Sequence, residues 1–598
     1  MPKLFQTLSI VLATCAAVAA AVAGEGPAGH AHDEPAGGHA HGEPATGHAH
    51  AAMAVAEDAI ERNATPFPVT TEGLPEARPT ATVELRDGDR YRLTAAYVKK
   101  TVGGRTLRML AFNGSVPGPF IRAAEGAEVT IDFENLTDLD LTIHSHGLRL
   151  DNRFDGVPGI TQDPVGPGEQ FSYVIRFPDA GVFWYHPHTR EDYGQELGLY
   201  GNYLVESALP GYWNPVNREV PLVLDDILIE DQRIAKFYRE FTNFALIGRF
   251  GSDFLVNGEQ DYAFEVEKGE VIRFFLTNVS NVRTFNLSLP GVKTKLVGAD
   301  LGRLEHETFV GNVLISPAER LVVEAYFPTA GTYQLIHTQP DGRVRLASIT
   351  VTDGPGPAES FLKAFARERH NETVMAEFDE LRHYVEAEPD KRLLLTIDLG
   401  EQTVDHSMHA HMHSDDGAHD HGEHIALATS LPSDYQPLTP TAEALASLQW
   451  ADPQQADRTH RTPEIRWQLV DEDTGKVSEA IDDWTFRQGE IVKIRLTNDP
   501  EADHVMQHPM HLHGQQFAVL AVDGLFNSNM VWKDTVLVPP DQTVDILVRM
   551  TNPGVWMAHC HIAEHLHAGM ALTFRVEDAD GNAPGDDYRG DRSAAHRH

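Results

Sequence analysis

The sequences EGAEVTIDFEN, KGEVIRFFLTN and QGEIVKIRLTN begin at Glu125, Lys268 and Gln488 and follow one pattern. Each has a glycine and a glutamate, then a run rich in apolar and β-branched residues, then an asparagine. Such runs are typical of half-buried strands. Because the copies lie more than a hundred residues apart, the pattern predicts one β-domain used three times.

The sequence around these copies has the same texture, with short alternating strands separated by Gly, Pro, Asn and Asp. We therefore expect an all-β protein built from β-sandwich domains. An apolar periodicity near 3.6 residues between the second and third blocks predicts a helical linker. The predicted segments are domain 1 at 80–210, domain 2 at 218–353, the linker at 354–388, domain 3 at 390–578 with a His-rich insertion at 401–462, and a disordered tail at 579–598.

The N-terminus reads as an export signal over 1–23, with Lys3 before an apolar stretch and small residues up to Ala23. We expect cleavage, no membrane span afterwards, and a periplasmic or extracellular location. Thr14 before Cys15 is unfavourable for a lipoprotein signal, so we expect no lipidation. The following segment, 24–66, repeats the phrase GHAH and is too polar to form a core, which predicts disorder.

The charge balance is acidic: 48 Lys and Arg against 88 Asp and Glu give a net charge of −40. Such a surface repels phosphate backbones, so we expect no nucleic-acid partner. With 2 Cys and 32 His, a disulfide framework is excluded and metal binding is favoured. We expect a monomer, with Cys560 as the only cysteine left after cleavage.

Four short motifs together hold ten histidines and Cys560. On a strand, residues two apart share a face, so each His-x-His pair can direct both imidazoles at one point. The motifs are His144-Ser145-His146, His186-Pro187-His188, His508-Pro509-Met510-His511-Leu512-His513, and His559-Cys560-His561-Ile562-Ala563-Glu564-His565, which Met570 follows.

The same alternation predicts two metal sites around one motif, because the sulfur of Cys560 faces away from its neighbouring histidines. His508, Cys560, His565 and Met570 form a two-histidine, one-thiolate set with a weak axial thioether, the ligand set of a blue-copper site. Eight histidines remain on the other side and suit three copper ions with open positions for an oxygen species. They are His144, His146, His186, His188, His511, His513, His559 and His561.

These motifs resemble the copper signature of the multicopper oxidases, the family of laccases, ferroxidases and cuprous oxidases. The likeness extends from about Thr80 to Val576 and includes Pro317-Ala318-Glu319-Arg320 and Lys533-Asp534-Thr535-Val536. It implies three cupredoxin-like Greek-key domains and four copper ions, one type 1, one type 2 and two type 3. By motif position, type 1 would take His508, Cys560, His565 and Met570, type 2 would take His144 and His511, and the type 3 pair would take His146, His186, His188, His513, His559 and His561.

The resemblance also implies a reaction, in which a donor is oxidised at type 1 and O₂ is reduced to water at the other three coppers. Electrons would cross through Cys560 to its covalent neighbours. Two acids at family positions, Asp155 and Glu564, are candidates for catalytic proton supply. Each also has a plainer interpretation, because Asp155 precedes a glycine as turn residues do and Glu564 could orient an imidazole.

The donor is left open by the sequence. A His-rich segment from Asp405 to His424 occupies a place comparable to the Met-rich insertion of bacterial copper-efflux cuprous oxidases, but imidazole prefers Cu(II) over Cu(I). The leading hypothesis is an oxidase of Cu(I), and of phenols, in copper tolerance. One alternative is a ferroxidase, which oxidises Fe(II), or a manganese oxidase. The other is a non-enzymatic copper buffer. A two-domain nitrite reductase is excluded by the three blocks.

Overall fold

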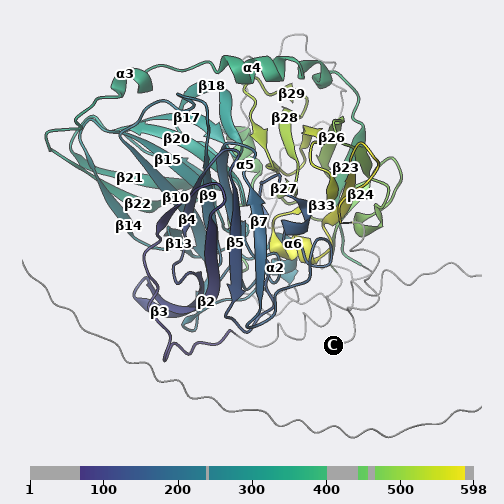
Figure 1. The fold of residues 1–598 in the computed structure, drawn as a ribbon, viewed down its shortest axis with the longest axis horizontal. Helices are drawn as coiled ribbons and strands as arrows, with labels where there is room; N and C mark the ends of the chain where they lie inside the picture. Colours follow the sequence, from purple (N-terminus) through teal and green to yellow (C-terminus); the bar gives the residue numbers. More distant parts are fainter. Residues whose placement is uncertain (1–66, 238–241, 401–441, 456–464, 586–598) are drawn as a thin grey trace, which may run out of the picture. The chain divides into compact units, whose positions relative to one another are not determined.

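The computed structural model describes residues 67–237, 242–400, 442–455 and 465–585, which are mostly strands (Figure 1). The expected signal at 1–23, the repeat at 24–66 and most of the insertion at 401–462 lie outside the described residues. Within the described part of the chain, no helix is long and apolar enough to cross a membrane.

The first pair of sheets lies between residues 82 and 206. Buried Leu93, Ile131 and Tyr173 belong to its core. One sheet has the order β1 (Thr82–Leu85), β4 (Phe120–Ala124), β9 (Gly201–Glu206), β8 (Gly181–His186) and β6 (His144–His146), and the other has β3 (Arg105–Phe112), β2 (Arg90–Val102), β5 (Glu128–Asn135) and β7 (Gln170–Arg176).

The second pair lies between residues 218 and 352, around a core that includes Phe274, Val323 and Leu346. A small ribbon of β11 (Ile229–Glu230) and β12 (Arg233–Ile234) lies outside it. The sheets are β13 (Asp253–Val256), β10 (Arg218–Ile227), β15 (Val271–Asn278), β20 (Arg320–Tyr326), β17 (Lys293–Ala299) and β18 (Gly302–Val310); and β14 (Tyr262–Glu267), β22 (Gly342–Thr352), β21 (Gly331–Gln339), β16 (Phe285–Ser288) and β19 (Val313–Ile315).

The third pair lies between residues 391 and 577, and Leu395, Ile494 and Ile546 belong to its core. In all three pairs neighbouring strands are mostly non-consecutive in sequence, as in Greek keys. The sheets are β24 (Arg466–Asp471), β23 (Lys391–Asp398), β26 (Ile491–Asn498), β32 (Thr543–Arg549), β28 (Gln516–Val522) and β29 (Leu525–Phe526), with β30 (Trp532–Lys533) also on β28; and β25 (Thr485–Arg487), β34 (Ala571–Glu577), β33 (Gly554–Cys560), β27 (His508–Leu512) and β31 (Thr535–Val538).

The repeated sequence forms the same strand in each pair, as β5, β15 and β26. Its final asparagine is buried each time and donates from Nδ2 to a backbone carbonyl later in the chain. Asn135 donates to Val165 at 2.8 Å, Asn278 to Ile315 at 3.0 Å, and Asn498 to Met506 at 2.6 Å. The asparagine therefore recurs because a buried backbone carbonyl needs a donor.

Short helices connect and cover the sheets. The predicted linker at 354–388 contains α3 (Leu362–Phe365), α4 (Glu372–Asp379) and the 3-10 helix η2 (Arg382–Val385). Two helices that the sequence analysis did not predict are α2 (Thr242–Ile247) in the second pair and α5 (Ala442–Ser447) inside the expected insertion. The remaining helices are η1 (Asn152–Phe154), η4 (Ser478–Ala480) and α6 (Ala563–His567).

The segment after β34 differs from the predicted tail over its first residues. The Pro584 carbonyl accepts a hydrogen bond from the Val555 amide at 3.1 Å, and Asn582 donates to Asp578. Pro584 is therefore bonded to β33, because this strand has an amide to satisfy. The predicted all-β fold is confirmed, and the three sheet pairs support the domain boundaries that we propose.

Candidate metal centre

The four histidine motifs lie on two pairs of neighbouring strands or directly after them. In the first sheet pair, β6 is antiparallel to β8, and His144 is opposite His186. In the third pair, β27 is antiparallel to β33, and His511 is opposite His559. The predicted strand geometry therefore brings two motifs together within each pair of sheets.

The eight histidines predicted for the oxygen-reactive cluster are brought together from both sheet pairs, and all are buried. The rings of His146 and His511 stack with centroids 3.7 Å apart and planes at 16°. Ligand atoms within 4.8 Å of one another form three trios of histidines: His144, His146 and His511; His146, His186 and His561; and His188, His513 and His559.

One nitrogen of most of these rings is held by an acceptor, which leaves the other free to bind a metal. His144 Nδ1 donates to the Asp155 carbonyl at 2.7 Å, and His186 Nδ1 donates to that of Pro187 at 2.9 Å. Their Nε2 atoms are buried and have no hydrogen-bond partner among the described residues. A buried nitrogen without a hydrogen-bond partner among the described residues is also found in His146, at Nδ1, and in His511 and His561, at Nε2.

Burial also favours the neutral form of His146, His186 and His511. Desolvation lowers the pKa of His146, His186 and His511 well below the ordinary value, with further lowering by neighbouring imidazoles. Neutral rings with unpartnered nitrogens are good ligands for copper. The residues therefore fit the copper that the sequence analysis predicted.

The second predicted site lies on the other side of β33. Cys560 Sγ is 3.7 Å from Nδ1 of both His508 and His565, and those two nitrogens are 3.3 Å apart. Met570 is buried and its amide donates to the His565 carbonyl at 3.0 Å. Burial raises the pKa of the Cys560 thiol, so thiolate formation there depends on a bound cation.

Trp467, which the sequence analysis did not single out, packs against this second site. Its indole lies 4.2 Å from the His565 ring and 4.8 Å from the His508 ring, centroid to centroid. Its Nε1 donates to the Ala245 carbonyl in α2 at 2.8 Å. Trp467 belongs to no motif, and only the tertiary structure reveals these contacts.

The two candidate acids occupy different positions. Asp155 lies at the cluster, with Oδ2 2.9 Å from His513 Nδ1 and Oδ1 3.3 Å from His144 Nδ1. Glu564 is buried beside α2, where it accepts from the Arg249 amide and from Asn281 Nδ2, both at 2.8 Å. Burial raises the pKa of Glu564.

A cavity borders the cluster on the side of His186, His188, His559 and His561. Glu191 and Glu196 also line it, and Glu191 Oε1 is 3.3 Å from His188 Nδ1. Glu191 was not predicted from the sequence, although it lies only three residues after His188. This cavity gives a small molecule space next to the imidazoles.

Comparison with known proteins agrees with this geometry. Two family models described as multicopper oxidase match residues 94–209 and 447–580. A copper resistance protein A homolog of Pseudomonas syringae pv. tomato is 25% identical, over 82% of this chain and 93% of its own length. Laccase-15 of Oryza sativa subsp. japonica is 26% identical, over 85% of this chain and 93% of its own length.

Solved structures give the same result for the fold. A multi-copper oxidase from Pseudomonas thermotolerans superposes with a TM-score of 0.58 at 25% identity, covering 83% of this chain and 100% of that one. Together with the site, these matches define a copper-dependent oxidoreductase of cupredoxin-like domains that uses O₂ as its electron acceptor. Two regions of the chain therefore match multicopper oxidase models, and over more than four fifths of its length the chain is similar to a copper resistance protein, a laccase and a multi-copper oxidase.

Proposed function

We propose that this chain couples one-electron oxidation of a small donor to the four-electron reduction of O₂ to water, in copper tolerance. The observation that carries the proposal is the convergence of orphaned imidazole nitrogens from two sheet pairs beside a cysteine–histidine site. Bound copper would supply the redox chemistry, accepting electrons at the Cys560 site and delivering them to O₂ at the histidine cluster.

The ligand sets follow the predicted assignment. His508, Cys560, His565 and Met570 would hold type 1 copper, and His144 and His511 would hold type 2. The trios that contain His186 and His188 support our assignment of the two type 3 ions, which would be held in all by His146, His186, His188, His513, His559 and His561. Cys560 is joined covalently to His559 and His561, so the shortest bonded route between the sites runs along β33.

Asp155 is the acid that we assign to proton supply at the cluster. Its carboxylate is buried and contacts both His513 and His144, so a proton on it is held next to the imidazoles. Glu564 is the second candidate, since burial favours its protonated form. Its partners Arg249 and Asn281 hold the carboxylate in place, and Asn281 lines the cavity that borders His559 and His561.

Cu(I) is the donor that the second site favours. His508, Cys560, His565 and Met570 all have 0% exposure, so a phenol cannot touch a ligand directly. A small ion at the cover formed by Trp467 and α2 could transfer an electron across one layer of residues. The copper resistance protein A homologue supports the same role, with the His-rich segment from Asp405 to His424 as a metal-capture device. Export through the predicted signal belongs to this proposal.

The test is O₂ consumption by the copper-loaded protein with Cu(I), Fe(II) and a phenol in parallel. Two variants are compared with the wild type: a deletion of 405–424, and a control of unchanged length in which the histidines of that segment are replaced by glutamine. We expect Cu(I) to be preferred and both variants to lose that preference alone. Dominant Fe(II) or phenol oxidation would contradict the copper-tolerance role, and no uptake with any donor would favour a copper buffer.

A further inference from the structure

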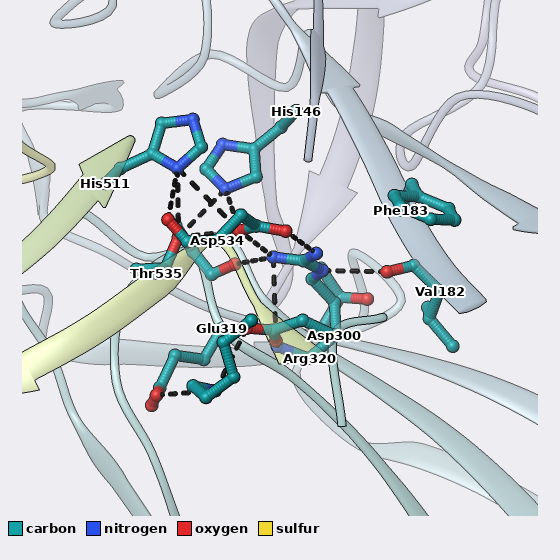
Figure 2. A network of polar contacts seen from close by, with 12 residues as sticks. His146, Val182, Phe183, Asp300, Glu319, Arg320, His511, Asp534 and Thr535 are labelled. Carbon is teal, nitrogen blue, oxygen red and sulfur yellow. Dashed lines mark hydrogen bonds and ion pairs between the residues drawn. The ribbon is translucent and has the colours of Figure 1, made fainter. Parts of the chain in front are cut away.

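One buried arginine of the second sheet pair reaches both other pairs (Figure 2). Arg320 begins β20, and its Nε donates to the Val182 carbonyl of β8 at 2.8 Å. Its Nη1 donates to Asp534 Oδ1 at 2.8 Å, and its Nη2 pairs with the other carboxylate oxygen of Asp534. Val182 is on β8, the strand that ends at His186. Arg320 therefore contacts the strand that carries one histidine motif and also Asp534, a residue that contacts two other cluster histidines.

Asp534 in turn holds two histidines of the cluster. Its carbonyl accepts from His511 Nδ1 at 2.8 Å, and its Oδ1 is 3.0 Å from His146 Nε2. The Thr535 hydroxyl donates to the same Oδ1 at 2.9 Å and lies 3.0 Å from His146 Nε2. Because these contacts occupy one nitrogen of each ring, the orphaned atoms are His146 Nδ1 and His511 Nε2. Both belong to the trio completed by His144.

The residue after His146 shows how closely this carboxylate and guanidinium approach the ligand. Gly147 has φ +85°, and a Cβ there would lie 2.3 Å from Asp534 Oδ2 and 2.8 Å from Arg320 Nη2. Only glycine fits, in both conformation and space. The ion pair is thus packed directly against the backbone of Gly147, the residue that follows His146.

Arg320 is itself held by further buried charges. Its amide donates to Asp300 Oδ1 at 2.7 Å, and Lys533 Nζ contacts Asp300 Oδ2 at 2.9 Å and Glu319 Oε1 at 3.1 Å. Desolvation makes such buried ion pairs weak sources of net stability. Acceptors that orient metal-binding imidazoles, by contrast, commonly affect metal affinity and activity. The arrangement is therefore better explained by orientation of the ligands than by folding energy.

We propose that Arg320 is a positioning residue for the oxygen-reactive cluster, acting through Asp534 on His146 and His511. The second sheet pair, which contributes no predicted ligand, would then fix the tautomer and direction of two ligands contributed by the other pairs. The inference rests on the proposed function, since it assumes that these histidines bind copper. Arg320, which lies outside the four ligand motifs, would then help to determine the geometry of the cluster.

The test uses copper-loaded full-length protein and compares Arg320→Met with Arg273→Met. Arg273 is a suitable control because it is also buried in the second sheet pair and ion-paired, with Glu324 at 2.7 Å, yet does not contact Asp534. Copper content, the type 2 electron paramagnetic resonance signal, the thiolate–copper visible absorption and reoxidation of the reduced protein by O₂ are measured. Arg320→Lys and the isosteric Asp534→Asn carry the test if Arg320→Met does not fold.

We expect Arg320→Met to keep the visible absorption of the Cys560 site while its type 2 signal is altered or lost and its reoxidation is about 10- to 100-fold slower. Arg320→Lys should recover part of the rate, because an ammonium can contact one carboxylate oxygen but not two. Asp534→Asn should resemble Arg320→Met. Signals and rates equal to those of Arg273→Met, or equal loss of all coppers, would overturn the inference. A wild type with full copper but without a type 2 signal or O₂ uptake would instead refute the proposed function, and the inference with it.

Discussion

The Nε2 atom of His565 lies 3.1 Å from the carbonyl oxygen of Leu246. This contact joins α2 of the second sheet pair to the helix that follows the His-Cys-His motif. Because the carbonyl requires a donor, it fixes the proton on Nε2 and leaves Nδ1 to face Cys560 at 3.7 Å. The position of α2 thus controls the tautomer of a predicted type 1 ligand.

Gly248, just after α2, offers a test of this control. It has φ +78°, and a Cβ would lie 2.5 Å from Val282 Cγ2 and 3.0 Å from Ile562 Cγ2. We expect Gly248→Ala to displace α2 and lower the free energy of unfolding by about 1–3 kcal/mol through overpacking, in addition to backbone strain. The visible absorption of the copper-loaded Cys560 site should shift as well.

Gly126→Ala is the matched control, because Gly126 has φ +87° and nothing within 4 Å of the added Cβ. It should show the backbone strain alone, without a spectral change. Denaturant unfolding and visible spectra of both variants check the prediction. Equal stability losses and unchanged spectra in the two variants would show that α2 does not control the site.

Asp155→Asn tests proton supply at the cluster. The amide oxygen can still accept from His513 Nδ1, which contacts Asp155 at 2.9 Å, but the side chain can no longer hold a transferable proton. We expect the rate of O₂ reduction to fall by about 10²-fold or more while the Cys560 site is still reduced at the wild-type rate. Stopped-flow reduction and reoxidation, measured separately, distinguish the two steps, and equal slowing of both would contradict the assignment.

The sequence was sufficient to predict the fold class and the grouping of histidines within each motif, because each follows from a regular spacing of residues. The copies ending at Asn135, Asn278 and Asn498 form equivalent strands, and the His-x-His spacing places both rings of a motif on one face. Contacts between sheet pairs could not be predicted in this way. Leu246 and Trp467 belong to no pattern, and they act through a carbonyl and a ring face that tertiary packing alone brings to His565.

Arg320 shows an intermediate case. It falls in Pro317-Ala318-Glu319-Arg320, a stretch that the family resemblance includes, so the sequence marked the position without revealing its role. The role depends on Asp534, more than two hundred residues later. No spacing of residues within a local stretch of sequence predicts a contact over such a separation. The disagreement over the tail at 579–585 has a similar origin, because only the three-dimensional structure shows that the Val555 amide needs an acceptor.

Asp225 in β10 predicts a pH dependence of stability. Burial raises its pKa to about 7, and the neighbouring Asp226 adds to the shift. The folded state therefore keeps a proton that the unfolded state releases above about pH 4. Stability should fall by on the order of a few kcal/mol as the pH rises from about 4 to 7 and then level off.

Asp225→Asn should remove this fall, since the amide cannot ionise and can still accept the hydrogen bond from the Tyr200 hydroxyl, 2.9 Å away in the wild type. Urea unfolding midpoints of the metal-free protein between pH 5 and 8 provide the measurement. Parallel pH profiles for variant and wild type would mean that Asp225 ionises normally in the folded state.

Met570 and Cys560 should differ in what their loss does to the second site. Cys560→Ser removes the soft thiolate, so we expect the visible absorption and donor oxidation to disappear. The type 2 signal should stay, because its proposed ligands His144 and His511 belong to β6 and β27. Met570→Leu keeps the buried volume close to constant and removes only a weak axial ligand. It should retain the visible absorption and raise the reduction potential, as measured by redox titration, since a ligating thioether stabilises the oxidised ion. Loss of absorption in Met570→Leu would show that Met570 is needed to hold the metal, whereas an unchanged potential would show that its sulfur does not contact the metal at all.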